Sequence, residues 1–220
     1  INWFDLDRDG YPELVINNDH SPYENSDSLI YYQHPVDGFR SFLPTMSDEG
    51  GAFEKIAWMR AAEAEGHVEF LPSMGGGRSL IEDLDGDGRP EIIFTNFIHG
   101  STHDHFPVFV YWGTDSGYSP NRRSEFPTES ATGVAVADLN RDGRLDLVIA
   151  NMGKEDDTVF ASSGPLAVEA PSINDGATAQ AQIYWQGQDG FSIERVSELP
   201  TRHAVDVKIG DLNDDGPLWS

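Results

Sequence analysis

The stretch of sequence that decides the fold reads DLDGDGRPEIIF and spans residues 83–94. Two close copies occur elsewhere, DLDRDGYPELVI at 5–16 and DLNRDGRLDLVI at 138–149, and a shorter one, DLNDDG, lies at 211–216. Each complete copy joins an acidic loop to a run of large apolar residues. Self-similarity at intervals of tens of residues is the signature of repeat architectures.

The rest of each repeat carries three further landmarks in a fixed order. An asparagine ends the apolar run, an aromatic pair follows, and a Leu-Pro-Thr or Phe-Pro-Thr tripeptide comes last. In chain order these lie at Asn18, 31–32 and 43–45, then at Asn96, 111–112 and 126–128, then at Asn151, 184–185 and 199–201. Two insertions, at about 46–77 and 153–180, account for the unequal intervals. Without them each repeat has roughly 50–55 residues, near the length of a propeller blade.

Each repeat is predicted to form four antiparallel strands. Repeat 3 is the template, with strands expected at 133–137, 146–150, 181–185 and 191–196. The second of these is apolar throughout, as in a strand buried on both faces, and the Asp-Gly pair at 189–190 is a strong hairpin signal. A four-stranded meander with more polar outer strands is the blade of a β-propeller.

We therefore predict an all-β fold, a single partial β-propeller domain over 1–220 with about three blades. Its repeats are expected at about 1–78, 79–132 and 133–204, with the start of a fourth at 205–220. Closed propellers have about four to eight blades, so we interpret the chain as an open fragment of a longer protein. The alternatives are a sandwich or solenoid of hairpins, and a dimer that closes a six-bladed ring.

The composition excludes several classes of function. The chain has 38 Asp and Glu against 14 Lys and Arg, a formal net charge of -24, so binding to nucleic-acid phosphates is not expected. It has no cysteine, which excludes disulfides and thiolate metal sites. No apolar run is long enough to cross a membrane as a helix, so no membrane insertion is expected. Aromatic residues make up 11% of the chain, too many for a disordered acidic segment.

The acidic loop has the pattern Asp-x-[Asp/Asn]-x-Asp-Gly-x-x-[Asp/Glu]. Oxygen side chains at positions 1, 3, 5 and 9 converge when the glycine permits a sharp turn, and the carbonyl of position 7 adds another oxygen. Ca²⁺ takes about six to eight such ligands. The pattern is not an EF-hand, because position 12 is apolar. The predicted ligands are Asp5, Asp7, Asp9, Tyr11, Glu13, Asp83, Asp85, Asp87, Arg89, Glu91, Asp138, Asn140, Asp142, Arg144, Asp146, Asp211, Asn213 and Asp215.

The fourth loop lacks the closing acid, since its position 9 is Trp219, so we expect weak binding or none there. The plain alternative for all four loops is a set of Asp-Gly turns. That alternative does not explain why so many carboxylates are packed into nine residues, where they repel one another without a cation.

The pattern resembles the FG-GAP repeat, also called the VCBS repeat, of bacterial surface proteins and of the integrin alpha-subunit propeller. The resemblance implies a propeller, usually of seven blades, in which Ca²⁺ clamps the hairpin between the first two strands of a blade. It also implies an extracellular, cell-surface or periplasmic setting. The partners implied are a protein or carbohydrate ligand and the remaining blades of the full-length chain. Fold alone does not choose among such functions.

One further cluster has chemical potential, the loop 99–105 with His99, His103 and His105. Three imidazoles suit a transition metal or acid–base catalysis, but solvated loop residues are the plainer interpretation. We therefore expect a non-catalytic calcium-binding module used in binding or adhesion. The alternative is the propeller part of a polysaccharide lyase or glycoside hydrolase that uses these histidines.

Two smaller features have two interpretations each. The aromatic pairs suit either sugar stacking or packing within blades, and their fixed place in a strand favours packing. The segment 55–65 has helix-forming composition and is predicted to be a helix or an extra hairpin.

Overall fold

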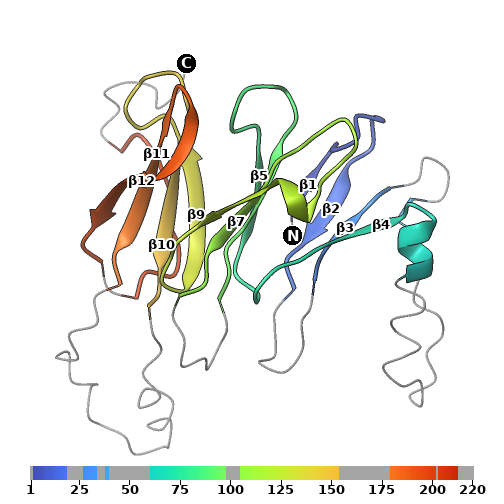
Figure 1. Ribbon diagram of the computed structural model, residues 1–220, viewed down its shortest axis with the longest axis horizontal. Coiled ribbons are helices and arrows are strands. Elements are labelled where there is room, and N and C mark those ends of the chain that lie inside the picture. The colour runs from blue at the N-terminus through green and yellow to red at the C-terminus, as the bar shows by residue number, and fades with distance from the viewer. Residues whose placement is uncertain are drawn as a thin grey trace, which may run out of the picture.

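The computed structural model describes residues 2–18, 27–33, 38–39, 60–97, 105–153, 179–201 and 203–212. These residues form three four-stranded antiparallel sheets (Figure 1). The first contains β1 (Asn2–Phe4), β2 (Glu13–Ile16), β3 (Ser28–Tyr31) and β4 (Val68–Leu71). The second contains β5 (Ser79–Glu82), β6 (Glu91–Phe94), β7 (Val108–Tyr111) and β8 (Arg123–Phe126), with a 3-10 turn at Pro120–Arg122. The third contains β9 (Ala131–Ala137), β10 (Asp146–Asn151), β11 (Ala181–Gly187) and β12 (Gly190–Leu199).

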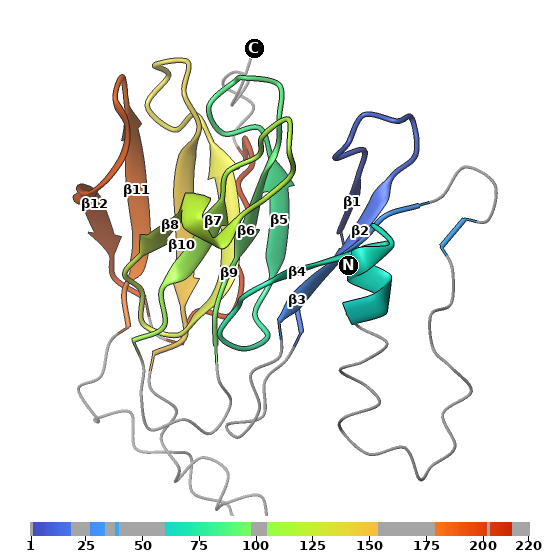
Figure 2. The same ribbon diagram turned by 45° about the vertical axis from the view of Figure 1, so that its right-hand side comes forward.

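Each sheet is a meander in which consecutive strands pair. The first strands of neighbouring sheets contact each other, β1 with β5 and β5 with β9. Figure 2 shows the three sheets side by side. Meanders that meet along their first strands are the blades of a propeller. The structure thus confirms the predicted all-β class with three blades, and the described sheets do not close into a ring.

Burial follows the order of strands within a blade. Strands β6, β7 and β10 are buried along their whole length, as their unbroken apolar runs predict. The outermost strand of blade three, β12, has no buried residue. β6 and β7 belong to the blade that has a neighbour on both sides, whereas the last strand of blade three keeps contact with water.

The core consists of apolar clusters shared between neighbouring blades. Blades one and two contribute Val15, Ile30, Ile81, Phe94 and Tyr111, whereas blades two and three contribute Ile93, Phe126, Val134, Leu147 and Tyr184. Within the second cluster, the rings of Phe126 and Tyr184 meet edge to face at 5.0 Å between centroids. Blades are therefore held together mainly by buried apolar area, at about 25 cal/mol per Å².

The repeated tyrosines lock each blade to the one before it. The Tyr111 hydroxyl donates to the carbonyl of Pro72, and the Tyr184 hydroxyl donates to the carbonyl of Pro127. Both side chains are at most 2% exposed. These two tyrosines therefore pack between blades and do not face a ligand.

The repeated asparagines hold the segment that connects one blade to the next through hydrogen bonds. The Asn96 side chain accepts the N–H of Met74 at 2.8 Å and donates to the carbonyl of Pro107. Asn151 accepts the N–H of Glu129 at 3.3 Å and donates to a carbonyl just before β11 in the same way. One side chain thus satisfies backbone groups from two segments, which explains its fixed place after the apolar run.

The insertion in repeat 1 does not occupy 46–77, where the sequence pattern places it. Strand β4 falls inside the expected insertion at 46–77 and pairs with β3. Leu71 is its last residue and Pro72 and Ser73 follow it. The carbonyl of Pro72 accepts the tyrosine hydrogen bond that the carbonyl of Pro127 accepts one blade later. The tripeptide landmark of blade one is therefore 71–73, whereas 43–45 lies outside the described residues. The extra chain runs between β3 and β4 and includes a helical turn at 60–64, within the segment 55–65.

The segment 203–212 lies beside β9. The Ala204 N–H donates to the carbonyl of Asn151 at 3.1 Å, and the Thr132 hydroxyl donates to the carbonyl of Ala204 at 2.9 Å. The start of a fourth repeat is expected at about 205–220, but no strand forms in the described residues 203–212. Among the described residues, no helix has the length and apolar character needed to span a bilayer.

Candidate metal centres

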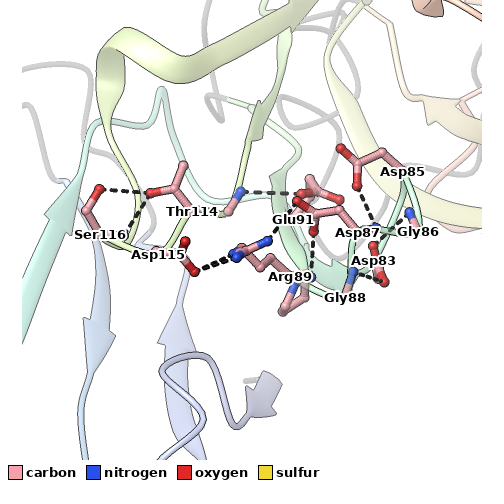
Figure 3. A network of polar contacts seen from close by, with 12 residues as sticks. Asp83, Asp85, Gly86, Asp87, Gly88, Arg89, Glu91, Thr114, Asp115 and Ser116 are labelled. Atoms are coloured by element: carbon pink, nitrogen blue, oxygen red, sulfur yellow. Dashed lines mark hydrogen bonds and ion pairs between the residues drawn. The ribbon is translucent and has the colours of Figure 1, made fainter.

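The three complete acidic loops join the first two strands of each blade, and Figure 1 shows them at the same end of the molecule. Each is numbered here from its first aspartate. In loop two, Asp83 accepts the N–H of Gly88 at 2.8 Å (Figure 3). Asp85 accepts the N–H of Asp87 at 3.1 Å, and Asp87 accepts the N–H of Arg89 at 2.7 Å. The carboxylates at positions 1, 3 and 5 thus hold the loop's own backbone.

The glycine at position 6 makes this turn possible. Its φ is 92° at Gly10, 83° at Gly88 and 83° at Gly143, in the left-handed region that favours glycine. In all three loops its N–H donates to the aspartate at position 1. The shared geometry shows that the three loops are one structural unit repeated.

The closing carboxylate at position 9 lies in the interior. Glu13, Glu91 and Asp146 are at most 1% exposed. Each accepts the N–H of the leucine at position 2, at 2.5, 2.7 and 3.0 Å respectively. Burial raises the pKa of Glu13 and of Glu91 to about 7, and neighbouring loop carboxylates add to the effect. Burial also raises the pKa of Asp146.

Positions 1, 3 and 9 converge in the first two loops. Oxygen atoms of Asp5, Asp7 and Glu13 lie within 4.8 Å of one another, as do those of Asp83, Asp85 and Glu91. In loop one, Asp5 Oδ1 and Glu13 Oε1 are buried and have no hydrogen-bond partner among the described residues. A buried, unpaired carboxylate oxygen is unfavourable unless a cation or proton is beside it.

This donor set fits a hard divalent cation. All side-chain candidates offer oxygen, the described loops contain no imidazole, and the chain has no thiolate. Carboxylate, amide and carbonyl oxygens are the ligands that Ca²⁺ selects. Asp5, Asp7 and Glu13 would hold it in loop one, and Asp83, Asp85 and Glu91 in loop two.

The position 5 carboxylates stand apart from these groups. Asp87 pairs with the Arg89 guanidinium at 3.2 Å, and Asp142 pairs with Arg144. In loop three, position 3 is Asn140, so a neutral amide replaces one carboxylate. Loop three therefore offers the least negative donor set of the three.

For several residues the predicted role in metal binding or catalysis remains a prediction. The position 7 carbonyls of Tyr11, Arg89 and Arg144 remain predicted ligands. Of the fourth loop, Asp211 is described, whereas Asn213 and Asp215 lie outside the described residues. His99 and His103 also lie outside them, and His105 is exposed.

The structure adds residues that the loop pattern does not contain. Gly113 and Gln186 each follow an aromatic pair. The N–H of Gly113 donates to Glu91 at 3.3 Å, and the N–H of Gln186 donates to Asp146 at 3.0 Å. The fixed spacing from the aromatic pair is the signal that identifies this position. The equivalent residue of blade one is Gln33, and within the described part of the chain no such bond reaches Glu13 Oε1.

Two pockets lie beside the loops at equivalent places in two blades. One of about 330 Å³ is lined by Asp7, Asp9, Tyr32, Gln33, Glu65, Gly66 and His67. The other, of about 370 Å³, is lined by Asp85, Asp87, Trp112, Gly113, Asn121, Arg122, Arg123, Gln186 and Gly190. Each combines two loop carboxylates with the second aromatic residue of a pair.

These features define a β-propeller-type repeat with acidic interstrand loops. Residues 83–149 match the family model described as FG-GAP-like repeat, which confirms the predicted resemblance over this part of the chain. The match begins at loop two and ends in the strand that follows loop three. No curated protein and no solved structure matches the chain.

Proposed function

We propose that the chain is a calcium-binding, extracellular β-propeller repeat module that binds a protein or carbohydrate. The observation that supports calcium most directly is in loop one, where Asp5 Oδ1 and Glu13 Oε1 are buried without a partner among the described residues. Asp7 offers a third oxygen within 4.8 Å. Three carboxylates at this separation repel one another unless a cation lies between them.

The ion's role follows from where the loop sits. Each loop connects the first two strands of a blade, and its closing carboxylate is the first residue of the second strand. When bound, Ca²⁺ supplies positive charge that neutralises the buried carboxylates. The residues around it then hold the hairpin in one geometry, which stabilises the blade and its contacts with the next.

An extracellular setting accords with such sites, because extracellular modules bind Ca²⁺ with Kd values of about 10⁻⁴–10⁻³ M. FG-GAP-like repeats are typically extracellular, which supports this setting for residues 83–149. The two pockets beside the loops support a ligand at this end of the molecule. Tyr32 and Trp112 line them, and aromatic rings stack on apolar faces of ligands.

Thermal unfolding tests the calcium proposal. We expect about 2 mM CaCl₂, slightly above the range of Kd values given for extracellular modules, to raise the Tm above its value in EDTA, because binding to the folded state alone stabilises it. Glu13→Gln should reduce this increment. Glu194→Gln, which removes the same charge from an exposed residue of β12, should leave it intact. An equal Tm in calcium and EDTA for the native chain would contradict the proposal.

Ligand binding is tested separately. Immobilised acidic and neutral polysaccharides and extracellular-matrix proteins are incubated with the chain in calcium or EDTA. We expect capture that depends on calcium and falls on Trp112→Ala. Calcium binding without any capture would remove the adhesion part of the proposal and leave the metal site standing.

A further inference from the structure

We propose that Gln186 couples the metal sites of loops two and three, so that an ion in one raises the affinity of the other. This inference rests on the proposed calcium function and adds how two sites act together. Gln186 belongs to β11 in blade three, yet its side chain reaches a loop of blade two. It is a positioning residue and not a ligand.

Gln186 makes one hydrogen bond to each loop. Its backbone N–H donates to Oδ1 of Asp146, the closing carboxylate of loop three, at 3.0 Å. Its side-chain Nε2 donates to the carbonyl of Leu84 in loop two, at 3.1 Å. The side chain is only 5% exposed. Both bonds are therefore shielded from water, where they are stronger than at a surface.

Leu84 is well placed to transmit a change to the metal ligands of loop two. It stands between Asp83 and Asp85, two of the converging carboxylates. Its N–H donates to Oε2 of Glu91 at 2.7 Å, so Glu91 holds the peptide group before Leu84 and Gln186 holds the one after it. The leucine side chain is 3% exposed and packs in the core that blades two and three share.

A continuous chain of buried contacts thus runs from Asp146 through Gln186 and Leu84 to Glu91. An ion in loop three fixes the Asp146 carboxylate and, through it, the start of this chain. The Leu84 carbonyl is then held in the orientation that places Asp83 and Asp85 toward Glu91. The coupling is reciprocal, because a bound ion in loop two must favour loop three by the same factor.

The buried amide of Gln186 is itself unusual. Its Oε1 has no hydrogen-bond partner among the described residues. An apolar side chain of similar size would fill the space without this unpaired oxygen, so the amide is best explained by the bond it makes to Leu84. That hydrogen bond links blade three to blade two.

Loops one and two lack this relay. The equivalent of Gln186 in blade two is Gly113, which has no side chain to reach back to loop one. A Cβ at Gly113 would lie 2.7 Å from the carbonyl oxygen of Pro90, so the position does not accept a longer residue. A different contact joins these two loops, from the Arg8 guanidinium to the Gly88 carbonyl at the surface. The relay is therefore specific to loops two and three.

The test is a cycle of calcium affinities in the full 220-residue chain with loop one silenced by Asp5→Asn and Asp7→Asn. Isothermal titration with CaCl₂ gives the affinity of loop two before and after Asp138→Asn, which weakens loop three but keeps Asp146 and Gln186. We expect Asp138→Asn to lower the affinity of loop two roughly five-fold. With Gln186→Leu present, Asp138→Asn should leave that affinity unchanged.

Gln182→Leu is the matched control, because it removes a hydrogen-bonded amide from the same strand but far from both loops. It should keep the five-fold effect. If Gln186→Leu does not fold by circular dichroism, Gln186→Asn replaces it, since a side chain one methylene shorter cannot span to Leu84.

The outcomes separate the two proposals. No calcium binding by the unsubstituted chain overturns the proposed function. If the chain binds calcium but Asp138→Asn leaves the calcium affinity of loop two unchanged, the coupling alone is overturned. A five-fold effect that persists in the Gln186 variants overturns the role of Gln186.

Discussion

Glu13 and Glu91 place carboxyl groups in the interior of the molecule, where a negative charge needs a cation or a proton beside it. Their raised pKa values, about 7 for each, mean that protons and calcium compete for the same oxygens near neutral pH. The second oxygen of Glu91 accepts an N–H from Gly113, whereas that of Glu13 has no partner among the described residues. Loop one should therefore depend on its ion most strongly.

This competition predicts the pH dependence of stability without calcium. In the unfolded chain the two glutamates titrate near their ordinary pKa of 4.5, so between pH 4.5 and about 7 the folded state holds more protons. The folded state's advantage is full below pH 4.5 and is lost as the pH rises through about 7. In EDTA the free energy of unfolding should fall from pH 5 to pH 8.

Urea titrations at stepped pH measure this slope. The double variant Glu13→Gln, Glu91→Gln should flatten it, because amides do not titrate. The Glu194→Gln variant serves as the control and should keep the slope. Millimolar calcium should reverse the trend, since deprotonated carboxylates bind the ion more tightly. A slope that is identical with and without the two glutamates would refute the assignment.

At the scale of single elements, the hydrogen bond from Tyr184 to Pro127 joins blade three to blade two. Tyr184→Phe should lower the free energy of unfolding by about 1 kcal/mol, the typical net worth of one hydrogen bond. Tyr31→Phe is the matched control, because Tyr31 holds the same repeat position in blade one and its hydroxyl has no partner among the described residues. Equal effects of the two substitutions in chemical denaturation would show that the bond between blades contributes nothing.

Gly133 in β9 tests how the segment 203–212 is held. A Cβ there would lie 2.7 Å from the Cα of Asp206, closer than packed atoms allow. Gly133→Ala should therefore displace this segment and cost about 1–3 kcal/mol, as overpacking does. Hydrogen exchange should show faster exchange at Ala204, whose N–H bonds the carbonyl of Asn151. Gly143→Ala cannot serve as the control for Gly133→Ala, because the positive φ of Gly143 would add backbone strain. Unchanged exchange at Ala204 would contradict the close contact.

Elements with a strong local pattern could be predicted from sequence. The acidic loops, the apolar strands after them and the four-strand blade all follow from residues close together in the chain. The outer strand of blade one could not, because 43–45 (Leu-Pro-Thr) fits the repeat pattern better than the true landmark at 71–73 (Leu-Pro-Ser). Only the pairing of β4 with β3 and the bond from Tyr111 to Pro72 distinguish the two. Gln186 was missed for a similar reason, since its partner Leu84 is 102 residues away.

At the scale of the whole molecule, the acidic loops account for part of the formal net charge of -24. Three complete loops concentrate carboxylates at one end of the molecule, and three Ca²⁺ ions would bring the formal charge to -18. Calcium should therefore relieve repulsion between loops as well as within them. The remaining acidic residues keep the surface negative, which favours solubility and disfavours polyanionic partners.

Monovalent salt separates these two effects. In EDTA, raising NaCl to 0.5 M should partly restore stability, because screening weakens the repulsion between exposed carboxylates. It should not restore the full effect of calcium, because buried oxygens such as Glu13 Oε1 are screened much less. The Tm in 0.5 M NaCl with EDTA, compared with the Tm in 2 mM CaCl₂, measures the difference. If salt alone matched calcium, specific coordination would be unnecessary.

Isothermal titration of the unsubstituted chain with CaCl₂ tests the central claim most directly. The account predicts saturable binding by sub-millimolar to millimolar concentrations, lost progressively as Asp5, Asp83 and Asp138 are replaced by asparagine. Far-UV circular dichroism confirms that each sample is folded. A folded chain that binds no calcium at 5 mM, well above the range expected of extracellular sites, would contradict the account.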